Sequence, residues 1–223
     1  MSARASRVAC VLLAAVCLGN AAAQDRIDVE DLRIRSDAGD RSAMRQLAEL
    51  YYLGRGGVGQ DFGEAARWYE RLAKQGDARA QASLGLMYAR GYGVPKNLET
   101  ARRWWSFAAA QNDPGAQYNL GVMYFTGEGA PRDYKQAAHW LDRAAQRGHV
   151  QAQHNLGVLY REGKGVERDP QLGYFWIKVA ALQGDEVAQA SLPAAARDIS
   201  PEQVSEADGR AGEWMRQKRA LPQ

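Results

Sequence analysis

An internal repeat of 36 residues is the sequence feature that most restricts how this chain folds. A tryptophan, a leucine, a tyrosine and an Asp or Asn all return at this interval. Such a period is typical of solenoid folds, in which each repeat packs only on its neighbours. The first copy carries one extra loop residue, so its Leu47 and Tyr51 stand 37 residues before Leu84 and Tyr88. The repeated positions are Trp68, Trp104, Trp140 and Trp176; Leu84, Leu120, Leu156 and Leu192; Tyr88, Tyr124 and Tyr160; and Asp61, Asn97, Asp133 and Asp169.

Each repeat is predicted to form two antiparallel helices. In the third copy Ala116, Leu120 and Tyr124 are four residues apart, so they lie on one stripe of a helix. An acidic or amide residue stands before each helix, where its side chain caps the free backbone N–H groups. His149 replaces this residue in the fourth copy, so we expect a weaker cap there. The predicted units are 40–76, 77–112, 113–148 and 149–184, with a partial fifth at 185–192.

The glycines have a structural interpretation. Pairs such as Gly127 and Gly129 fall between the two helices of every unit, where the first glycine suits the left-handed end of a helix. A phosphate-binding loop is the alternative, because Gly54 and Gly59 have the required separation. Gln60 and Asp61 stand where that loop needs Lys and Ser or Thr. Recurrence in every unit favours the structural interpretation.

The repeated tryptophans are predicted to be core residues, because a small residue precedes each by three positions. Trp105 lies outside the repeat pattern and is expected to be partly exposed. The chain carries 29 Lys and Arg against 26 Asp and Glu, a formal charge of only +3. A near-neutral chain with buried rings has little to attract a phosphate backbone, so no nucleic-acid partner is expected.

The pattern Ala-x-x-x-Leu-Gly-x-x-Tyr-x-x-Gly-x-Gly, followed by Asp or Asn and then Ala-x-x-Trp-x-x-x-Ala, resembles the Sel1-like repeat, a relative of the tetratricopeptide repeat. The best copies are Ala80–Gly93, Ala116–Gly129 and Ala152–Gly165. The first unit departs from the pattern at Ala48, and the fifth stops at Pro193. The resemblance implies an all-α, right-handed α-solenoid of antiparallel helix pairs. It also implies a role in assembling other proteins, through a protein or peptide partner.

By analogy with tetratricopeptide repeats, one stripe of the first helices should line a concave binding face. Its composition suits a peptide better than a nucleic acid, because Arg residues at both ends flank an aromatic and aliphatic middle that includes Ala89 and Val122. Helix-to-helix packing remains the alternative for Val122 and Phe125. The predicted partner-binding residues are Arg45, Glu49, Tyr52, Arg79, Tyr118, Phe125, Gln151, His154 and Arg161.

The N-terminus is predicted to be a signal peptide over residues 1–23. Arg4 and Arg7 precede an apolar stretch of 11 residues, and Ala21 to Ala23 form the cleavage pattern. The stretch falls short of the ~20 residues that span a bilayer. Cleavage after Ala23 would give a periplasmic or secreted protein without cysteine, because Cys10 and Cys17 lie in the signal. An uncleaved anchor and a cytosolic scaffold are the alternatives.

Two flanking segments are predicted to cover the ends of the stack. Residues 24–39 form an N-terminal cap or linker, with a short helix near Ile27 to Asp37. Residues 193–223 form a capping helix and tail, because Ser200, Pro201 and Gln203 give a helix start. A solenoid needs such covers for solubility. We expect a monomer.

No catalytic, cofactor-binding or metal-binding residues are predicted. His139, His149 and His154 fit no metal-ligand spacing, and the acidic residues form no evident acid and base pair. We therefore expect a non-enzymatic scaffold or adaptor in envelope signalling or assembly. Some cysteine-rich members of the resembled family are described as β-lactam-binding or hydrolysing. That activity is not carried over, because their repeats are pinned by disulfides and the predicted mature chain has no cysteine. A cell-wall protein that binds or hydrolyses peptidoglycan or β-lactams is kept as the alternative function.

Overall fold

The computed structural model describes residues 28–220, so the predicted signal peptide lies outside the described residues. This part of the chain contains eleven α-helices and no strand, which confirms the predicted solenoid of helix pairs as the fold class. The helices are α2 (Val29–Asp37), α3 (Arg41–Leu53), α4 (Phe62–Lys74), α5 (Ala78–Arg90), α6 (Leu98–Ala110), α7 (Pro114–Thr126), α8 (Tyr134–Gln146), α9 (Val150–Glu162), α10 (Pro170–Leu182), α11 (Glu186–Ala196) and α12 (Pro201–Ala220).

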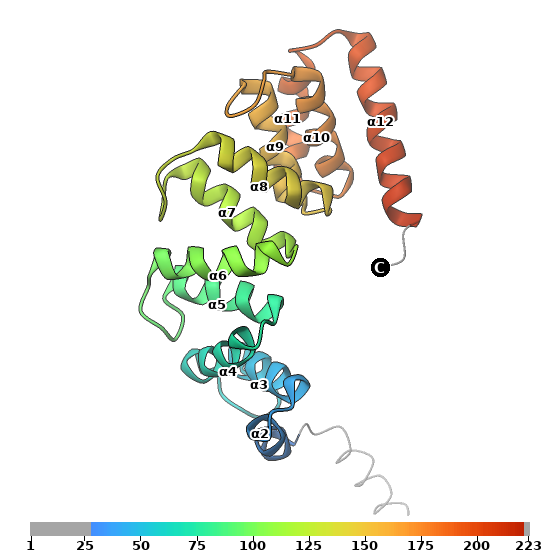
Figure 1. Cartoon of the computed structure of the whole chain (residues 1–223). Coiled ribbons are helices and arrows are strands. Elements are labelled where there is room, and N and C mark those ends of the chain that lie inside the picture. Colours follow the sequence, from blue (N-terminus) through green and yellow to red (C-terminus); the bar gives the residue numbers. More distant parts are fainter. Residues whose placement is uncertain (1–27, 221–223) are drawn as a thin grey trace, which may run out of the picture. The chain divides into compact units, whose positions relative to one another are not determined.

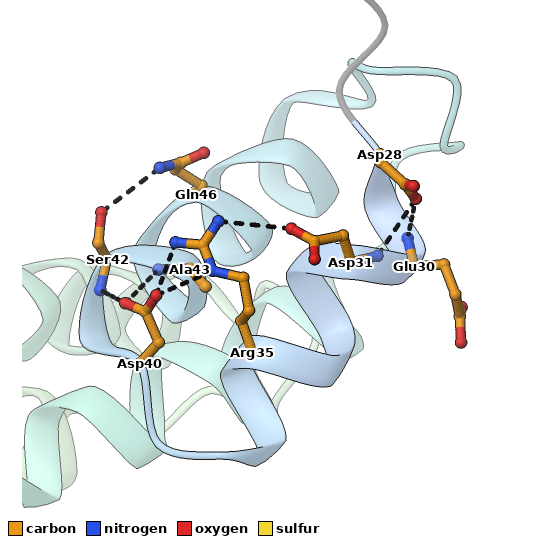
Figure 2. A network of polar contacts seen from close by, with 8 residues as sticks. All are labelled: Asp28, Glu30, Asp31, Arg35, Asp40, Ser42, Ala43 and Gln46. Carbon is orange, nitrogen blue, oxygen red and sulfur yellow. Dashed lines mark hydrogen bonds and ion pairs between the residues drawn. The ribbon is translucent and has the colours of Figure 1, made fainter.

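The chain divides into two compact units whose boundary, between Trp68 and Tyr69, lies within α4. In the first unit α2 packs on α3, and Arg35 connects them (Figure 2). The Arg35 guanidinium donates from Nε and Nη2 to Asp40 Oδ2 at 3.0 and 2.6 Å, and from Nη1 to Asp31 at 3.4 Å. Asp40 also caps α3 through the backbone N–H groups of Ser42 and Ala43. The Arg35 hydrogen bond and these N–H groups lower the pKa of the Asp40 carboxyl.

In the second unit, α5 with α6, α7 with α8, and α9 with α10 form three helical hairpins that succeed one another along the chain (Figure 1). Asp113 Oδ1 accepts the Ala116 N–H at 2.7 Å at the start of α7. His149 Nδ1 accepts the equivalent Ala152 N–H at 3.3 Å at the start of α9. The longer bond to a neutral ring agrees with the weaker cap predicted there. Asn112 adopts a φ of 69° after α6, in the left-handed region where glycine or asparagine commonly ends a helix.

Within each hairpin a glycine lets the two helices approach closely. A Cβ on Gly121 would lie 2.7 Å from Leu141 Cγ, and a Cβ on Gly85 would lie 2.5 Å from the Trp105 indole. The prediction that Trp105 is partly exposed was wrong, because this ring fills the space over Gly85. Trp105 is only 5% exposed, and its Nε1 donates to the Ala82 carbonyl at 3.2 Å.

The repeated tryptophans do not share one environment. Trp68 and Trp176 are buried, at 5% and 7% exposure, whereas Trp104 and Trp140 are partly exposed. The prediction of a uniform core stripe was therefore wrong for two of the four. Trp176 is buried because Trp214 from α12 packs against it edge to face, with ring centroids 5.9 Å apart.

A repeated glutamine ties each hairpin to the preceding one. Its Nε2 donates to a backbone carbonyl eight residues earlier, near the end of the preceding second helix. This group is buried in the central repeats, where an unmade hydrogen bond would be costly. The four bonds are Gln81 to Ala73 at 3.0 Å, Gln117 to Ala109 at 3.1 Å, Gln153 to Ala145 at 3.1 Å and Gln189 to Ala181 at 3.2 Å.

The third repeat leaves this glutamine incompletely paired. In the second and fourth repeats, the Oε1 atom of this glutamine accepts a hydrogen bond from a later glutamine. Gln111 Nε2 donates to Gln81 Oε1 at 2.8 Å, and Gln183 Nε2 donates to Gln153 Oε1 at 2.5 Å. Arg147 occupies the equivalent donor position for Gln117, and its guanidinium bonds the Arg143 carbonyl instead. Gln117 Oε1 is consequently a buried acceptor without a hydrogen-bond donor.

The C-terminal helix α12 packs on α10 (Figure 1). Ala207 and Ala211 are fully buried in this contact. Asp208 accepts a hydrogen bond from the Tyr174 hydroxyl at 3.0 Å and pairs with Lys178 at 2.9 Å. Burial, followed by this carboxylate, raises the pKa of Tyr174 to about 12. Between α10 and α12 in the sequence, helix α11 continues through Pro193 to Ala196. Across residues 28–220 no helix has the length and apolarity needed to cross a membrane.

Candidate binding surface

Three predicted partner-binding residues lie on α3 in the first unit. Glu49 is exposed, and Arg45 and Tyr52 are partly exposed. The Tyr52 ring meets Phe62 edge to face with centroids 5.2 Å apart. The tyrosine is therefore held by a second helix rather than standing alone.

The other six predicted residues lie on α5, α7 and α9 of the second unit, and they fall into two groups. Arg79 and Gln151 are exposed on α5 and α9. The other four are partly buried, because neighbouring segments cover them. They are Tyr118, Phe125, His154 and Arg161.

The covered aromatic residues pack within the third repeat and against the fourth. Tyr118 stacks on the His149 ring with centroids 4.4 Å apart and planes 18° apart. Burial raises the pKa of Tyr118 and lowers that of His149. Phe125 meets Tyr134 edge to face at 5.6 Å. These contacts leave each ring only partly available to a ligand.

On α9 the predicted residues contact the segment around α11. The Arg161 guanidinium donates to Asp198 Oδ2 at 2.9 Å from Nε and 2.7 Å from Nη2. His154 Nε2 lies 3.2 Å from Ser191 Oγ. Both side chains thus join the fourth repeat to the C-terminal segment of the chain.

A cavity of about 340 Å³ lies where α5 and α7 meet the start of α6. Two stripe positions named from the sequence, Ala89 and Val122, contribute to its wall. Its lining combines the buried Trp105 and Met123 with the exposed Arg90, Lys96 and Glu128. Apolar walls with a few polar groups are typical of ligand pockets. The lining residues are Ala89, Arg90, Lys96, Leu98, Trp105, Asn119, Val122, Met123, Thr126 and Glu128.

The charged side chains of this cavity form no ion pair or hydrogen bond within the described part of the chain. Arg90, Lys96 and Glu128 have no ion-pair or hydrogen-bond partner for their side chains among residues 28–220, and neither does Asn119. Charged groups at the edge of a small apolar cavity are available to pair with a ligand. Sequence reasoning missed these four residues.

A comparison of repeats explains why the cavity is open. Ala89 and Leu98 occupy the positions that Phe125 and Tyr134 occupy one repeat later. There the two rings meet, and the Lys164 ammonium lies 5.7 Å over Tyr134. Smaller side chains at the same positions leave space between α5 and α7. This substitution between copies is the sequence signal that could have indicated the cavity.

A second open cavity, of about 470 Å³, lies where α12 covers α10. Trp176 and Trp214 contact each other there, and the Lys218 ammonium lies 5.4 Å over Trp214. Its main groups are thus already paired with one another, which makes the cavity between α5 and α7 the better candidate. Among residues 28–220 no cluster of three or more His, Cys, Asp or Glu side chains is placed to hold a metal ion.

Stacked helical hairpins with an open, partly charged surface on their first helices define a helical-repeat scaffold. The Sel1 repeat model matches residues 41–77, 78–113, 114–149 and 150–185, so the chain belongs to the Sel1 repeat family. Members of this protein-interaction family are generally non-catalytic scaffolds.

Two solved structures are similar to this chain at 31% sequence identity. One is c5321, a protective antigen of uropathogenic Escherichia coli strains with an SLR fold; its TM-score is 0.76, and the match covers 87% of this chain and 44% of that one. The other is a Sel1 repeat protein from Oxalobacter formigenes, with a TM-score of 0.67; the match covers 78% of this chain and 71% of that one.

A curated plant protein is similar over a short stretch. It is the ERAD-associated E3 ubiquitin-protein ligase component HRD3A of Arabidopsis thaliana, 32% identical over 66 residues. That stretch is 30% of this chain and 10% of the plant protein. The likeness therefore concerns a short part of each chain.

Proposed function

We propose that this protein is an exported, periplasmic adaptor that binds a protein or peptide partner through the first helices of its repeats. The observation that carries the proposal is the cavity between α5 and α7, whose charged side chains lack partners among the described residues. The plant relative is a component of a larger ligase, which favours a role in assembly. The proposed role is non-catalytic.

Export rests on the sequence of residues 1–23 and is tested directly. N-terminal sequencing of the protein from its native cells should give Gln24 as the first residue, and the protein should appear in the periplasmic fraction. A chain that starts at Met1 or Ser2 and remains with the cytoplasm would contradict the export part of the proposal.

Partner binding is tested by cross-linking in living cells. A photo-reactive amino acid placed at Arg79 or Gln151, both exposed on first helices, should capture one discrete partner. The matched control is Phe107, which is 57% exposed on the second helix α6. Capture at all three positions, or at Phe107 alone, would contradict a first-helix binding surface. Release of soluble fragments from purified peptidoglycan by the protein would instead favour a cell-wall function.

A further inference from the structure

The cavity between α5 and α7 brings an apolar wall and a cationic edge together. Its apolar part includes Leu98, Trp105 and Met123, and its rim includes the cations Arg90 and Lys96. The indole of Trp105 is held over Gly85, so the apolar wall is fixed before any ligand arrives. A fixed wall lowers the ordering cost of binding.

The size of the cavity limits what enters it. A volume of about 340 Å³ is at the small end of ligand sites. It accommodates one large apolar side chain with part of its backbone, and not a folded domain. A peptide that lies across the first helices and inserts one side chain matches this volume.

The charges around the cavity favour a negatively charged peptide. Arg90 and Lys96 face only one carboxylate within the lining, that of Glu128. Arg132 adds a third cation next to the rim, because its Nη2 donates to the Thr126 carbonyl at 3.2 Å. A carboxylate from the ligand would pair with these cations through charge-assisted hydrogen bonds.

We propose that this cavity binds an acidic peptide segment that carries one apolar side chain. The apolar side chain enters between α5 and α7 and contacts Trp105 and Met123. Carboxylates of the neighbouring peptide residues pair with Arg90 and Lys96 at the rim. The proposal rests on the proposed function and names the chemistry of its partner.

The test uses the full chain and short labelled peptides in a fluorescence anisotropy titration. The probe is the acetylated and amidated pentapeptide Glu-Glu-Leu-Glu-Glu. Its comparisons are the same peptide with Gln for each Glu, with Ser for Leu, and with Lys for each Glu. The first probe should bind at least tenfold more tightly than each comparison, and its affinity should fall as salt is added, because ion pairs at an exposed rim are screened.

The neighbouring repeat supplies a variant that closes the cavity. Ala89→Phe with Leu98→Tyr places in the second repeat the residues that the third already carries. This variant should lose at least tenfold in affinity. Arg90→Glu with Lys96→Glu should produce a similar loss while leaving the apolar wall unchanged. Phe107→Ala on the exposed side of α6 is the matched control and should bind as the original chain does.

Several outcomes would overturn the assignment. These are equal binding of the acidic and neutral peptides, tightest binding of the Lys peptide, or unchanged binding by both the closed and the charge-reversed variants. If cross-linking captures a partner at Arg79 or Gln151 while no probe binds, the cavity assignment falls and the proposed adaptor function stands.

Discussion

The third and fourth repeats have the same motif but different surroundings. Trp176 of the fourth repeat is buried under Trp214, while Trp140 of the third is partly exposed beneath the Arg143 guanidinium, which lies 5.2 Å from its ring. On the first helix of the fourth repeat, Arg161 is paired with Asp198. Later segments of the chain therefore contact both helices of the fourth repeat.

The difference teaches that a repeated residue does not have a repeated environment. Contacts within a hairpin are set by the motif, because both partners recur with it. Contacts beyond the hairpin depend on the next element, and α11 and α12 differ from the helices they replace. Four predictions test this contrast, beginning with the largest expected effect.

Replacing the two tryptophans with alanine should have unequal consequences. Trp176→Ala removes a buried aromatic side chain and should reduce the free energy of unfolding by about 3–5 kcal/mol. Trp140→Ala should cost about 1–2 kcal/mol, because the ring already contacts solvent and buries less apolar area. Urea titrations of both variants measure the difference. Equal losses would show that α12 does not determine the environment of Trp176.

The Arg161 and Asp198 pair should contribute measurably to the cover of the fourth repeat. We expect a coupling free energy of about 1 kcal/mol, since the bonds are charge-assisted and the pair is partly shielded. A double-mutant cycle with Arg161→Ala and Asp198→Ala measures it. The matched control is the exposed pair of Arg103 and Glu99, joined at 2.6 Å, for which about 0.3–0.5 kcal/mol is expected. Similar coupling free energies in both cycles would show that the Arg161 and Asp198 pair is no stronger than an exposed ion pair.

Arg147→Gln should stabilise the third repeat by about 1 kcal/mol. The new amide would stand where Gln183 stands in the fourth repeat, and it would donate to the buried Gln117 Oε1 that now lacks a donor. The increase is measured by urea or thermal unfolding. Arg147→Ala removes the charge without adding a donor, so it should give no such increase; an equal gain would assign the effect to the charge.

The smallest expected effect is a pH dependence at the start of the fourth repeat. Burial lowers the pKa of His149 below its ordinary value of 6.5, although Asp113 partly opposes the shift. The folded state thus binds fewer protons than the unfolded state, and stability present above pH 6.5 is lost as the pH falls below it. His149→Asn keeps a capping side chain that does not titrate. Thermal unfolding from pH 7.5 to 5 should show a steeper loss for the original chain, and parallel curves would contradict the prediction.

The sequence predicted those features of the fold that are local to one repeat. Helix starts at residues such as Asp113 and the left-handed Asn112 result from backbone chemistry, so they could be located without coordinates. The exposure of Trp140 could not, because it depends on the element that follows the hairpin. The burial of Trp105 was missed although its partner Gly85 belongs to the same hairpin and recurs with the motif. The cavity required a comparison of Ala89 and Leu98 with their counterparts in the next repeat. The predicted binding residues remain predictions.

The glutamine bonds between hairpins have a consequence for how such chains lengthen. Each glutamine amide donates its hydrogen bond to a main-chain carbonyl oxygen, a group that every residue type provides. A hairpin inserted by duplication can therefore donate its glutamine amide to a carbonyl of the preceding hairpin. It also provides a carbonyl for the glutamine of the following hairpin, so neither neighbour needs a compensating mutation. Growth by whole copies is then tolerated, while the side chains on each copy are left to diverge.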